Sequence, residues 1–198
     1  MTRVVAGQAR GRRLAVPPGR GTRPTSDRAR EGLFSALTAR CGGTLTGLGV
    51  LDLYAGSGAV GLEALSRGAD HVLLVEAQAK AAQVIRDNAR ALGLPGAEVL
   101  TGRVERLVAG PPTSGAAVGA TKAPYAVVFL DPPYDLSDAA VHAVLAGLRA
   151  HGWLADTAVV VVERATRAGE LAWPAGFLAE RSRRYGEATL WYGRAAPM

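Results

Sequence analysis

A glycine-rich segment flanked by acids is the first part of the sequence whose residues could do chemistry. Asp52–Gly61 follows an apolar run, precedes a helical pattern, and spaces its glycines as G-x-G-x-x-G. Glu76 stands 20 residues after Gly56, at the end of the next apolar run, where such folds hold the acid that binds a ribose. Because glycines let the backbone approach a ligand closely, this segment predicts a cofactor-binding turn between a strand and a helix.

Two cofactors fit this turn, and one carboxylate distinguishes them. Asp52 stands four residues before the first glycine, where it would repel the pyrophosphate of NAD. S-adenosylmethionine carries an ammonium and a sulfonium and no phosphate, so the same acid would attract it. Glu76 would serve either cofactor, because a carboxylate can accept hydrogen bonds from both ribose hydroxyls. The turn favours S-adenosylmethionine, leaves NAD open, and also leaves open a plain turn that Asp52 only caps or tethers.

A second group of functional residue types, Asp131-Pro132-Pro133-Tyr134, follows the apolar run Tyr125–Leu130. The two prolines fix φ and remove two N–H donors, which leaves outward carbonyls beside one carboxylate. The Asp131 carboxylate and the Pro132 carbonyl could accept the hydrogens of an amino group on a planar base and stabilise the positive charge that develops on it. Tyr134 could stack on the base.

The tetrapeptide therefore predicts methyl transfer to an exocyclic nitrogen by in-line displacement. Asp131 or water would then remove the extra proton. The alternative is a Pro-Pro turn that ends a strand, with Asp131 as its cap.

The elements around these motifs alternate between strands and helices. We expect strands at Leu48–Leu53, His71–Val75, Ala97–Leu100, Tyr125–Leu130 and Ala158–Val162, helices at Ala59–Arg67, Ala77–Leu92, Glu105–Val108 and Ser137–Ala150, and a last strand pair at Leu178–Tyr185 and Ala188–Tyr192. This order predicts a Rossmann-like α/β fold with a mostly parallel sheet, helices on both faces and an antiparallel terminal hairpin. Because ligands bind at the carboxyl ends of such strands, Asp52, Gly56 and Asp131 should converge.

Composition excludes several classes of protein. Hydrophobic residues make up 48% of the 198 residues, which is enough for a globular core. The apolar runs Ala126–Leu130 and Ala158–Val162 have five residues each, too few to cross a bilayer. The single cysteine, Cys41, excludes an internal disulfide and a thiol-based zinc site, so we expect no metal and a cytoplasmic location.

The net charge of +6 is distributed unevenly along the chain. Residues 1–30 hold eight arginines and one acid, a net of +7, and the remaining 168 residues carry −1. A localised basic arm indicates a nucleic acid before a membrane. We expect these arginines to contact phosphates: Arg3, Arg10, Arg12, Arg13, Arg20, Arg23, Arg28 and Arg30. The alternative is a solvated tail, since 21 arginines against two lysines would also follow from a GC-rich genome.

The N-terminal region also resembles a known family. The blocks that carry the resemblance are Arg3–Gly7, Arg10–Leu14, Arg23–Arg28, Arg30–Phe34, Asp52–Leu65 and Asp131–Tyr134. Together they are similar to the bacterial 16S ribosomal RNA guanine-N2 methyltransferases, within the class I S-adenosylmethionine-dependent methyltransferases. The last two blocks are shared with many amino methyltransferases, whereas the N-terminal blocks are more specific. The resemblance runs from about residue 3 to 192.

The resemblance implies a seven-stranded sheet and methyl transfer to the exocyclic N2 of one guanine in small-subunit ribosomal RNA. It implies cofactor contacts at Asp52, Tyr54, Ala55, Gly56, Ser57, Gly58, Glu76 and Ala77, and an adenine-side contact at Arg103 and Val104. It further implies a basic arm over residues 1–24, a helix over 25–43 and a catalytic domain over 44–198, acting as a monomer on ribosomal RNA or on the small subunit.

Other functions stay open at this point. A DNA amino-methyltransferase acting on adenine N6 or cytosine N4, or an enzyme acting on a glutamine side chain, can use a similar tetrapeptide. The basic arm argues against a protein substrate but not against DNA. An NAD(P)-binding oxidoreductase and a non-catalytic nucleic-acid-binding module are the alternatives from other classes. A second basic cluster, Arg181, Arg183 and Arg184, is expected to be the solvated face of an edge strand.

Overall fold

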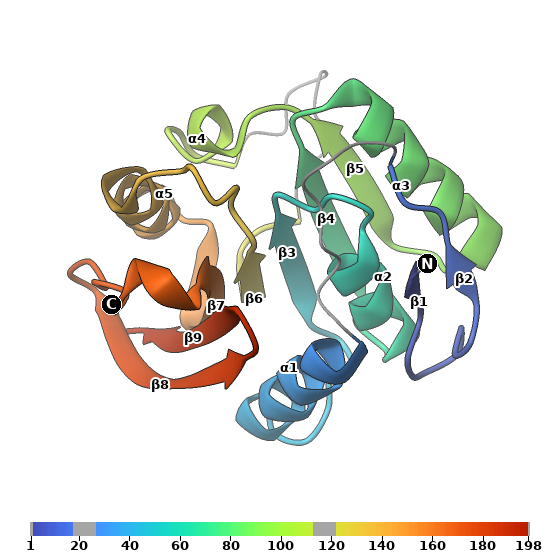
Figure 1. Ribbon diagram of the computed structural model, residues 1–198, viewed down its shortest axis with the longest axis horizontal. Helices are drawn as coiled ribbons and strands as arrows, with labels where there is room; N and C mark the ends of the chain where they lie inside the picture. The colour runs from blue at the N-terminus through green and yellow to red at the C-terminus, as the bar shows by residue number, and fades with distance from the viewer. Residues whose placement is uncertain (1, 18–26, 113–121, 198) are drawn as a thin grey trace.

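The structure is a computed structural model that describes residues 2–17, 27–112 and 122–197. Its centre is a seven-stranded sheet with the order β5-β4-β3-β6-β7-β9-β8 (Figure 1). The strands are β3 (Gly49–Leu53), β4 (His71–Glu76), β5 (Ala97–Thr101), β6 (Tyr125–Leu130), β7 (Leu154–Ala165), β8 (Phe177–Tyr185) and β9 (Ala188–Ala195). The first five are parallel, and β9 runs antiparallel to β7 and β8. The predicted Rossmann-like fold with an antiparallel terminal hairpin is confirmed.

Helices cover both faces of this sheet. They are α1 (Asp27–Arg40), α2 (Ala59–Ser66), α3 (Ala79–Leu92), α4 (Val104–Leu107) and α5 (Asp138–Ala150), with one 3-10 turn, η1 (Thr166–Ala168). Alternate strand residues enter two separate cores, because side chains in a strand point to opposite faces. Val50 joins the core under α1, α2 and α3, whereas Leu51 joins the core under α4 and α5.

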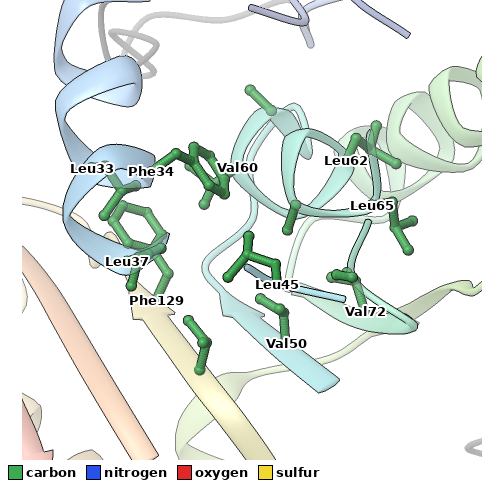
Figure 2. Close-up of a cluster of buried hydrophobic side chains, with 14 of the residues drawn as sticks. Leu33, Phe34, Leu37, Leu45, Val50, Val60, Leu62, Leu65, Val72 and Phe129 are labelled. Atoms are coloured by element: carbon green, nitrogen blue, oxygen red, sulfur yellow. The ribbon is translucent and has the colours of Figure 1, made fainter. Parts of the chain in front are cut away.

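The first of these cores binds α1 to the rest of the fold. Figure 2 shows Leu33, Phe34 and Leu37 of α1 beside Val60 of α2 and Phe129 of β6, and all five are buried. Burying a large apolar side chain of this kind stabilises the folded state by about 1.5–3 kcal/mol. Helix α1 therefore belongs to the same core as the sheet.

Strand β7 is longer than the apolar run that predicted it. The run Ala158–Val162 lies at its centre, but pairing with β9 continues through Glu163 and Arg164. Because these two residues are charged, the sequence did not indicate that the strand continues through them. They continue the ladder with their side chains buried, which matters for the site described below.

The N-terminal residues form a docked hairpin. Strands β1 (Thr2–Arg3) and β2 (Arg13–Leu14) pair antiparallel, within the extended segments expected from the sequence. The hairpin is held on α2 by Glu63, whose carboxylate accepts hydrogen bonds from the backbone N–H groups of Val5 at 2.6 Å and Ala6 at 2.9 Å.

Gly7 allows the close approach of this hairpin to the end of α2. It has a φ of +83°, and a Cβ at this position would come within 1.8 Å of the Ser66 carbonyl oxygen. The Ser66 hydroxyl accepts a hydrogen bond from Ala9 N at 2.9 Å and donates one to Ala6 O at 2.6 Å. The backbone of the hairpin is thus fixed by partners on α2.

Arg30 corrects one expectation about the basic arm. Its side chain is fully buried and donates to Thr2 Oγ1 at 2.6 Å, to the Arg3 carbonyl at 2.7 Å and to Asp27 Oδ1 at 2.6 Å. A guanidinium enclosed in this way ties the hairpin to α1 and is not available to a phosphate. Charge counting could not distinguish it from its exposed neighbours, because the distinction lies in its partners.

We predict that Glu63→Ala lowers the free energy of unfolding by about 2–5 kcal/mol, because it leaves two half-buried backbone N–H groups and the Arg67 guanidinium without their acceptor. Urea denaturation measures the change, and trypsin should then cleave the hairpin at Arg10 faster than in the wild type. Glu31→Ala, at an exposed position of α1, is the control and should change stability by less than about 0.5 kcal/mol. Equal stability of the two variants would contradict the tethering role of Glu63.

Candidate functional site

The glycine turn lies between the carboxyl end of β3 and the start of α2. Tyr54 has a φ of 63°, an uncommon conformation for a residue with a side chain, and it turns the chain sharply away from the strand. The next residue, Ala55, donates its N–H to the Val75 carbonyl of β4 at 2.9 Å. Gly56 and Gly58 also have positive φ values, which glycine adopts without strain. The predicted turn is therefore present and is fixed to two strands.

Asp52 tethers this turn to the helix that follows. Its carboxylate accepts the N–H of Gly61 at 2.8 Å, in the first turn of α2, where the positive end of the helix dipole favours an anion. The side chain is 2% exposed, and the pKa of the carboxyl group is raised to about 7, mainly by burial. The charge of nearby Glu76 contributes to this rise, and the hydrogen bond from Gly61 N opposes it. The tethering role that the sequence left open is thus present, and a cofactor contact by Asp52 stays a prediction.

Glu76 fixes the other side of the turn. One carboxylate oxygen accepts Gly56 N at 3.0 Å and the other accepts Gln78 N at 2.8 Å. Each carboxylate oxygen has two lone pairs, so each keeps acceptor capacity for a further donor such as a ribose hydroxyl. The two backbone N–H groups thus fix the orientation of the Glu76 carboxylate.

The backbone donors of the turn are largely used within the protein. Gly56 N bonds Glu76, Gly58 N bonds the Ala55 carbonyl at 2.7 Å, and Gly61 N bonds Asp52. A dinucleotide-binding turn needs such donors, and the helix N-terminus behind them, for its pyrophosphate. In this protein a carboxylate already occupies that helix N-terminus, so the geometry disfavours NAD(P).

Asp131 and the residues after it lie beside this turn, as the predicted strand order requires. Asp131 N donates to the Leu53 carbonyl at the end of β3, at 3.3 Å. Pro132 is buried, whereas Pro133 and Tyr134 are exposed, Tyr134 by 54%. The Pro133 carbonyl accepts Leu136 N at 2.9 Å, which closes a turn. Within the described ranges, no donor reaches the Pro132 carbonyl, so it is available to a ligand.

Arg164 supports this loop, and the sequence did not reveal its role. It is buried at the end of β7, and its guanidinium donates to the Leu136 carbonyl at 3.0 Å and to Asp138 at 2.8 Å. These contacts fix the segment after Tyr134 and the start of α5. Only its position directly after an apolar run could have signalled a structural role.

Glu163 is a second site residue that the sequence analysis missed. Leu130 pairs with Val162, so Asp131 and Glu163 follow at the same level on neighbouring strands, about 4.8 Å apart between backbones. Both residues lie on the face that carries Phe129 and Val161, the face covered by α1 and α2. The sequence signal was the same as that for Asp131, because Glu163 directly follows the apolar run Ala158–Val162.

Glu163, which the sequence analysis missed, completes a row of carboxylates with three acids that it predicted. Glu76, Asp52, Asp131 and Glu163 come from four adjacent strands, β4, β3, β6 and β7, and strand parity places all four on one face. Burial raises the pKa of Asp131 well above its ordinary range, and the negative charges of Glu163 and Asp52 add to the rise. Such a row favours cations and hydrogen-bond donors and repels phosphate.

The remaining predicted cofactor residues are spread around the turn. Ser57 is buried, and its carbonyl accepts Asn88 Nδ2 at 3.1 Å, whereas Ala77 is exposed beside Glu76. Arg103 is exposed and pairs with Glu105 at 3.4 Å. Val104 is 2% exposed and packs in the core under α4 and α5, so only its backbone could meet a ligand.

The hydroxyl group of Tyr54 is engaged in a hydrogen bond within the protein. It donates to Glu105 Oε1 at 2.9 Å, and burial together with this bond raises the pKa of the phenol. Tyr54 therefore joins the glycine turn to α4, next to the predicted adenine side of the site.

The arginines predicted to bind RNA do not form one group. Exposed positions are held by Arg3, Arg10, Arg12, Arg13 and Arg28, whereas Arg20 and Arg23 lie outside the described residues. Arg12 donates to the Ala91 carbonyl at 2.6 Å, near the end of α3. The tip of the hairpin thus lies against the end of α2 at Ser66, and its second strand lies along α3, where Ala15 bonds Asn88 and Arg12 bonds Ala91.

Comparison with known proteins assigns the chain to a family. The family model described as "Conserved hypothetical protein 95" matches residues 2–194. Ribosomal RNA small subunit methyltransferase D of Escherichia coli K12 is 35% identical over 185 residues, which span 93% of this chain and 85% of that protein. The chain belongs to the family of ribosomal RNA small subunit methyltransferase D.

Other relatives agree with this family. The putative rRNA methyltransferase YlbH of Bacillus subtilis is 37% identical over 67% of this chain and 66% of that protein. The solved structure of the putative methyltransferase yhhF from Escherichia coli superposes with a TM-score of 0.82, at 32% identity over 100% of this chain and 99% of that one. A precorrin-6y C5,15-methyltransferase from Geobacter metallireducens, 15% identical with a TM-score of 0.65, shares the fold alone.

None of the described helices is long and apolar enough to cross a membrane. In the same parts of the chain, no group of three or more His, Cys, Asp or Glu residues could hold a metal ion.

The family and the fold imply a cofactor of the S-adenosylmethionine type, and the site residues fit one. The row of carboxylates matches the two positive charges of that cofactor, Glu76 offers acceptors for ribose hydroxyls, and Gly58 lies so close to Ile85 that a Cβ would come within 2.9 Å of its Cγ2. The turn is therefore held tightly against α3.

The raised pKa of Asp52 has a consequence for stability. Between about pH 4 and 7 the folded state binds a proton that the unfolded state releases, so this residue makes the folded state less stable as the pH rises through that window. Asp52→Asn keeps an oxygen acceptor for Gly61 N. We predict that at pH 8 the variant is more stable than the wild type by about 1–4 kcal/mol, and that the difference disappears below about pH 4.

Chemical denaturation across this pH range measures the effect. Asp156→Asn, at an exposed position, is the control and should follow the wild type at every pH. A constant difference between Asp52→Asn and the wild type across the range would rule out the titration of Asp52 as its cause.

Proposed function

We propose that this protein transfers the methyl group of S-adenosylmethionine to the exocyclic N2 of a guanine in small-subunit ribosomal RNA. The observation that carries the proposal is the row of carboxylates that ends at Asp131 and Glu163, beside the available carbonyl of Pro132. The names of the curated relatives, which are ribosomal RNA methyltransferases, support the RNA substrate. We propose that the chain acts as a monomer in the cytoplasm, where that RNA is found.

The cofactor would supply an electrophilic methyl group, and the protein would orient it. Glu76 would accept the ribose hydroxyls, and the negative charge of Asp52 would attract the ammonium and sulfonium. Ala55–Gly58 would lie against it with their backbone, Ala77 beside the ribose, and Arg103 and the backbone of Val104 toward the adenine. A cation held there would also lower the raised pKa of Asp52 and keep it ionised.

The substrate amino group would be oriented by acceptors. An amino group on a planar base is a poor nucleophile, because its lone pair is delocalised into the ring. The Asp131 carboxylate and the Pro132 carbonyl would accept its two hydrogens, turn the lone pair toward the methyl group and stabilise the charge that forms. Asp131, whose pKa is raised by burial and by its neighbours, would be a stronger base than an ordinary carboxylate and fits the role of final proton acceptor. The exposed ring of Tyr134 would stack on the base.

Glu163 favours guanine over the other amino-bearing bases. Guanine presents a ring N1–H next to its 2-amino group, so its edge offers donors to two adjacent carboxylates. Adenine and cytosine present an unprotonated ring nitrogen next to the amino group, which two carboxylates would repel. The pair of Asp131 and Glu163 therefore supports a guanine substrate against the adenine and cytosine alternatives.

We predict that Asp131→Ala abolishes methyl transfer, by at least about 100-fold, and retains S-adenosylmethionine binding. The assay transfers labelled methyl groups to small ribosomal subunits from a strain that lacks the corresponding methyltransferase, followed by nucleoside analysis; calorimetry measures cofactor binding. Asp135→Ala, an exposed carboxylate in the same loop, is the control and should turn over normally. Label in methyladenosine or methylcytidine, or calorimetric binding of NAD in place of the methyl donor, would refute the proposed function.

We also predict that Glu163 sets the preference between guanine and 2,6-diaminopurine, which keeps the 2-amino group but lacks the N1–H. The wild type should prefer guanine by at least about 100-fold in kcat/KM, because the analogue leaves a buried carboxylate facing a ring lone pair. Glu163→Gln should narrow or reverse this preference, since its amide can donate to N1 of the analogue. Glu170→Gln, an exposed acid, should keep the wild-type ratio. An unchanged ratio in Glu163→Gln would exclude Glu163 from base selection.

A further inference from the structure

Three arginines on β8 form a basic strip at the edge of the sheet. Arg181, Arg183 and Arg184 are exposed, and β8 is the outermost strand (Figure 1). The sequence predicted only a solvated edge for this cluster. Two features of this cluster point to a ligand. The first is its position relative to the site, and the second is the set of contacts that its guanidinium groups make.

Register places the strip beside the carboxylate row. Glu163 pairs with Leu190 of β9, and Leu190 pairs with Arg183 of β8, so all three side chains lie at one level and on one face of the sheet. Two strand spacings separate Glu163 from Arg183, and three separate Asp131 from it, about 14 Å between backbones. The strip therefore flanks the row on the side of β7, whereas Arg12 lies on α3, which packs on β4 and β5 at the other side of the sheet.

Aromatic rings hold these arginines in place without neutralising them. The guanidinium of Arg181 lies 5.3 Å from the centroid of the Tyr192 ring, and that of Arg183 lies 5.4 Å from the centroid of Tyr185. Arg184 Nε donates to the Gly186 carbonyl at 2.9 Å. Among the described residues, no carboxylate forms an ion pair with any of the three. Their charge is thus available and partly immobilised, which lowers the entropy cost of binding an anion.

The acid nearest to the strip on its own strand is already neutralised. Glu180 is shared by Arg40 of α1 and Arg194 of β9. Gly32 of α1 packs so closely on Tyr185 that a Cβ would come within 1.9 Å of its hydroxyl oxygen, which fixes the end of β8 against α1. Arg181 and Arg183, which pair with Tyr192 and Leu190, therefore place a positive surface beside the negative row on the same face, whereas Arg184, which pairs with Thr189, points to the opposite face.

We propose that Arg181 and Arg183 bind the sugar–phosphate backbone of the RNA next to the nucleotide that enters the site. This inference rests on the proposed function, because it takes RNA as the substrate. Arginine guanidinium groups match phosphate oxygens in geometry, and backbone contacts of this kind fix the register of a nucleic acid without reading its sequence. The carboxylate row repels phosphate, so a basic surface two strands away from Glu163 would hold the backbone while the base alone enters.

The test compares the double variant Arg181→Gln/Arg183→Gln with the wild type in RNA binding and in methyl transfer across a salt series. We expect KM for small-subunit RNA to rise on the order of 10-fold, kcat and S-adenosylmethionine affinity to stay unchanged, and the log–log salt slope of RNA binding to fall by about 1.5. Arg181→Lys/Arg183→Lys keeps the charge and should retain most of the slope, which separates phosphate binding from packing on Tyr192 and Tyr185.

Arg90→Gln/Arg149→Gln removes the same charge from α3 and α5 and is the matched control, with RNA binding unchanged. Equal KM and salt slope in Arg181→Gln/Arg183→Gln and the wild type would overturn the inference, as would an equal loss in the control, which would indicate only net charge. Failure of the proposed function is distinguishable, since the wild type would then form no N2-methylguanosine in the same assay. RNA affinity that is unchanged while binding to a ribosomal protein is lost would assign the strip to a protein partner and also overturn the inference.

Discussion

The site depends on one interaction, the hydrogen bond from Gly61 N to the buried carboxylate of Asp52. It places an anion at the N-terminus of α2, the position where a dinucleotide-binding fold would receive a pyrophosphate. It fixes the turn between β3 and α2, and with Glu76 on the other side it uses the backbone donors of that turn. The same carboxylate raises the pKa of Asp131, so the electrostatics of both motifs are coupled through it. One buried acid thereby determines both the shape of the turn and the sign of charge that it accepts.

Much of this arrangement follows from sequence patterns, because periodicity and strand ends are local signals. The five parallel strands, the glycine turn and the convergence of Asp52 with Asp131 were all predictable from apolar runs and the rule that ligands bind at carboxyl ends of strands. Glu163 and Arg164 were not, because they extend β7 beyond its apolar run, and the sequence alone does not show that a charged residue continues a ladder. Arg30 was misassigned for a related reason: its burial depends on Thr2, Arg3 and Asp27 being brought together in space.

The docking of the hairpin determines which of the described arginines in residues 1–30 remain exposed and unpaired. Arg30 is enclosed, Arg3 is paired with Asp27, and the tip of the hairpin lies at the far ends of α2 and α3. Asn88 nevertheless joins the hairpin to the glycine turn, since its amide exchanges two hydrogen bonds with Ala15 and donates a third to the Ser57 carbonyl. Asn88 therefore fixes the end of the hairpin and the glycine turn relative to each other, in addition to the contacts of the hairpin with Glu63 and Ser66 on α2.

Under the proposed function, the opposite charges on one face of the sheet constrain how an RNA substrate approaches. The carboxylate row would repel the phosphate backbone from the strand ends, while the arginines of β8 on one side and those of the hairpin on the other would attract it. A base would then reach Asp131 only if it left the stack while its backbone stayed outside, as in other enzymes that modify bases. The cost of unstacking is a few kcal/mol and is least for a nucleotide that is already unpaired. The charge pattern would therefore favour an exposed or loosely stacked nucleotide over one in a continuous duplex.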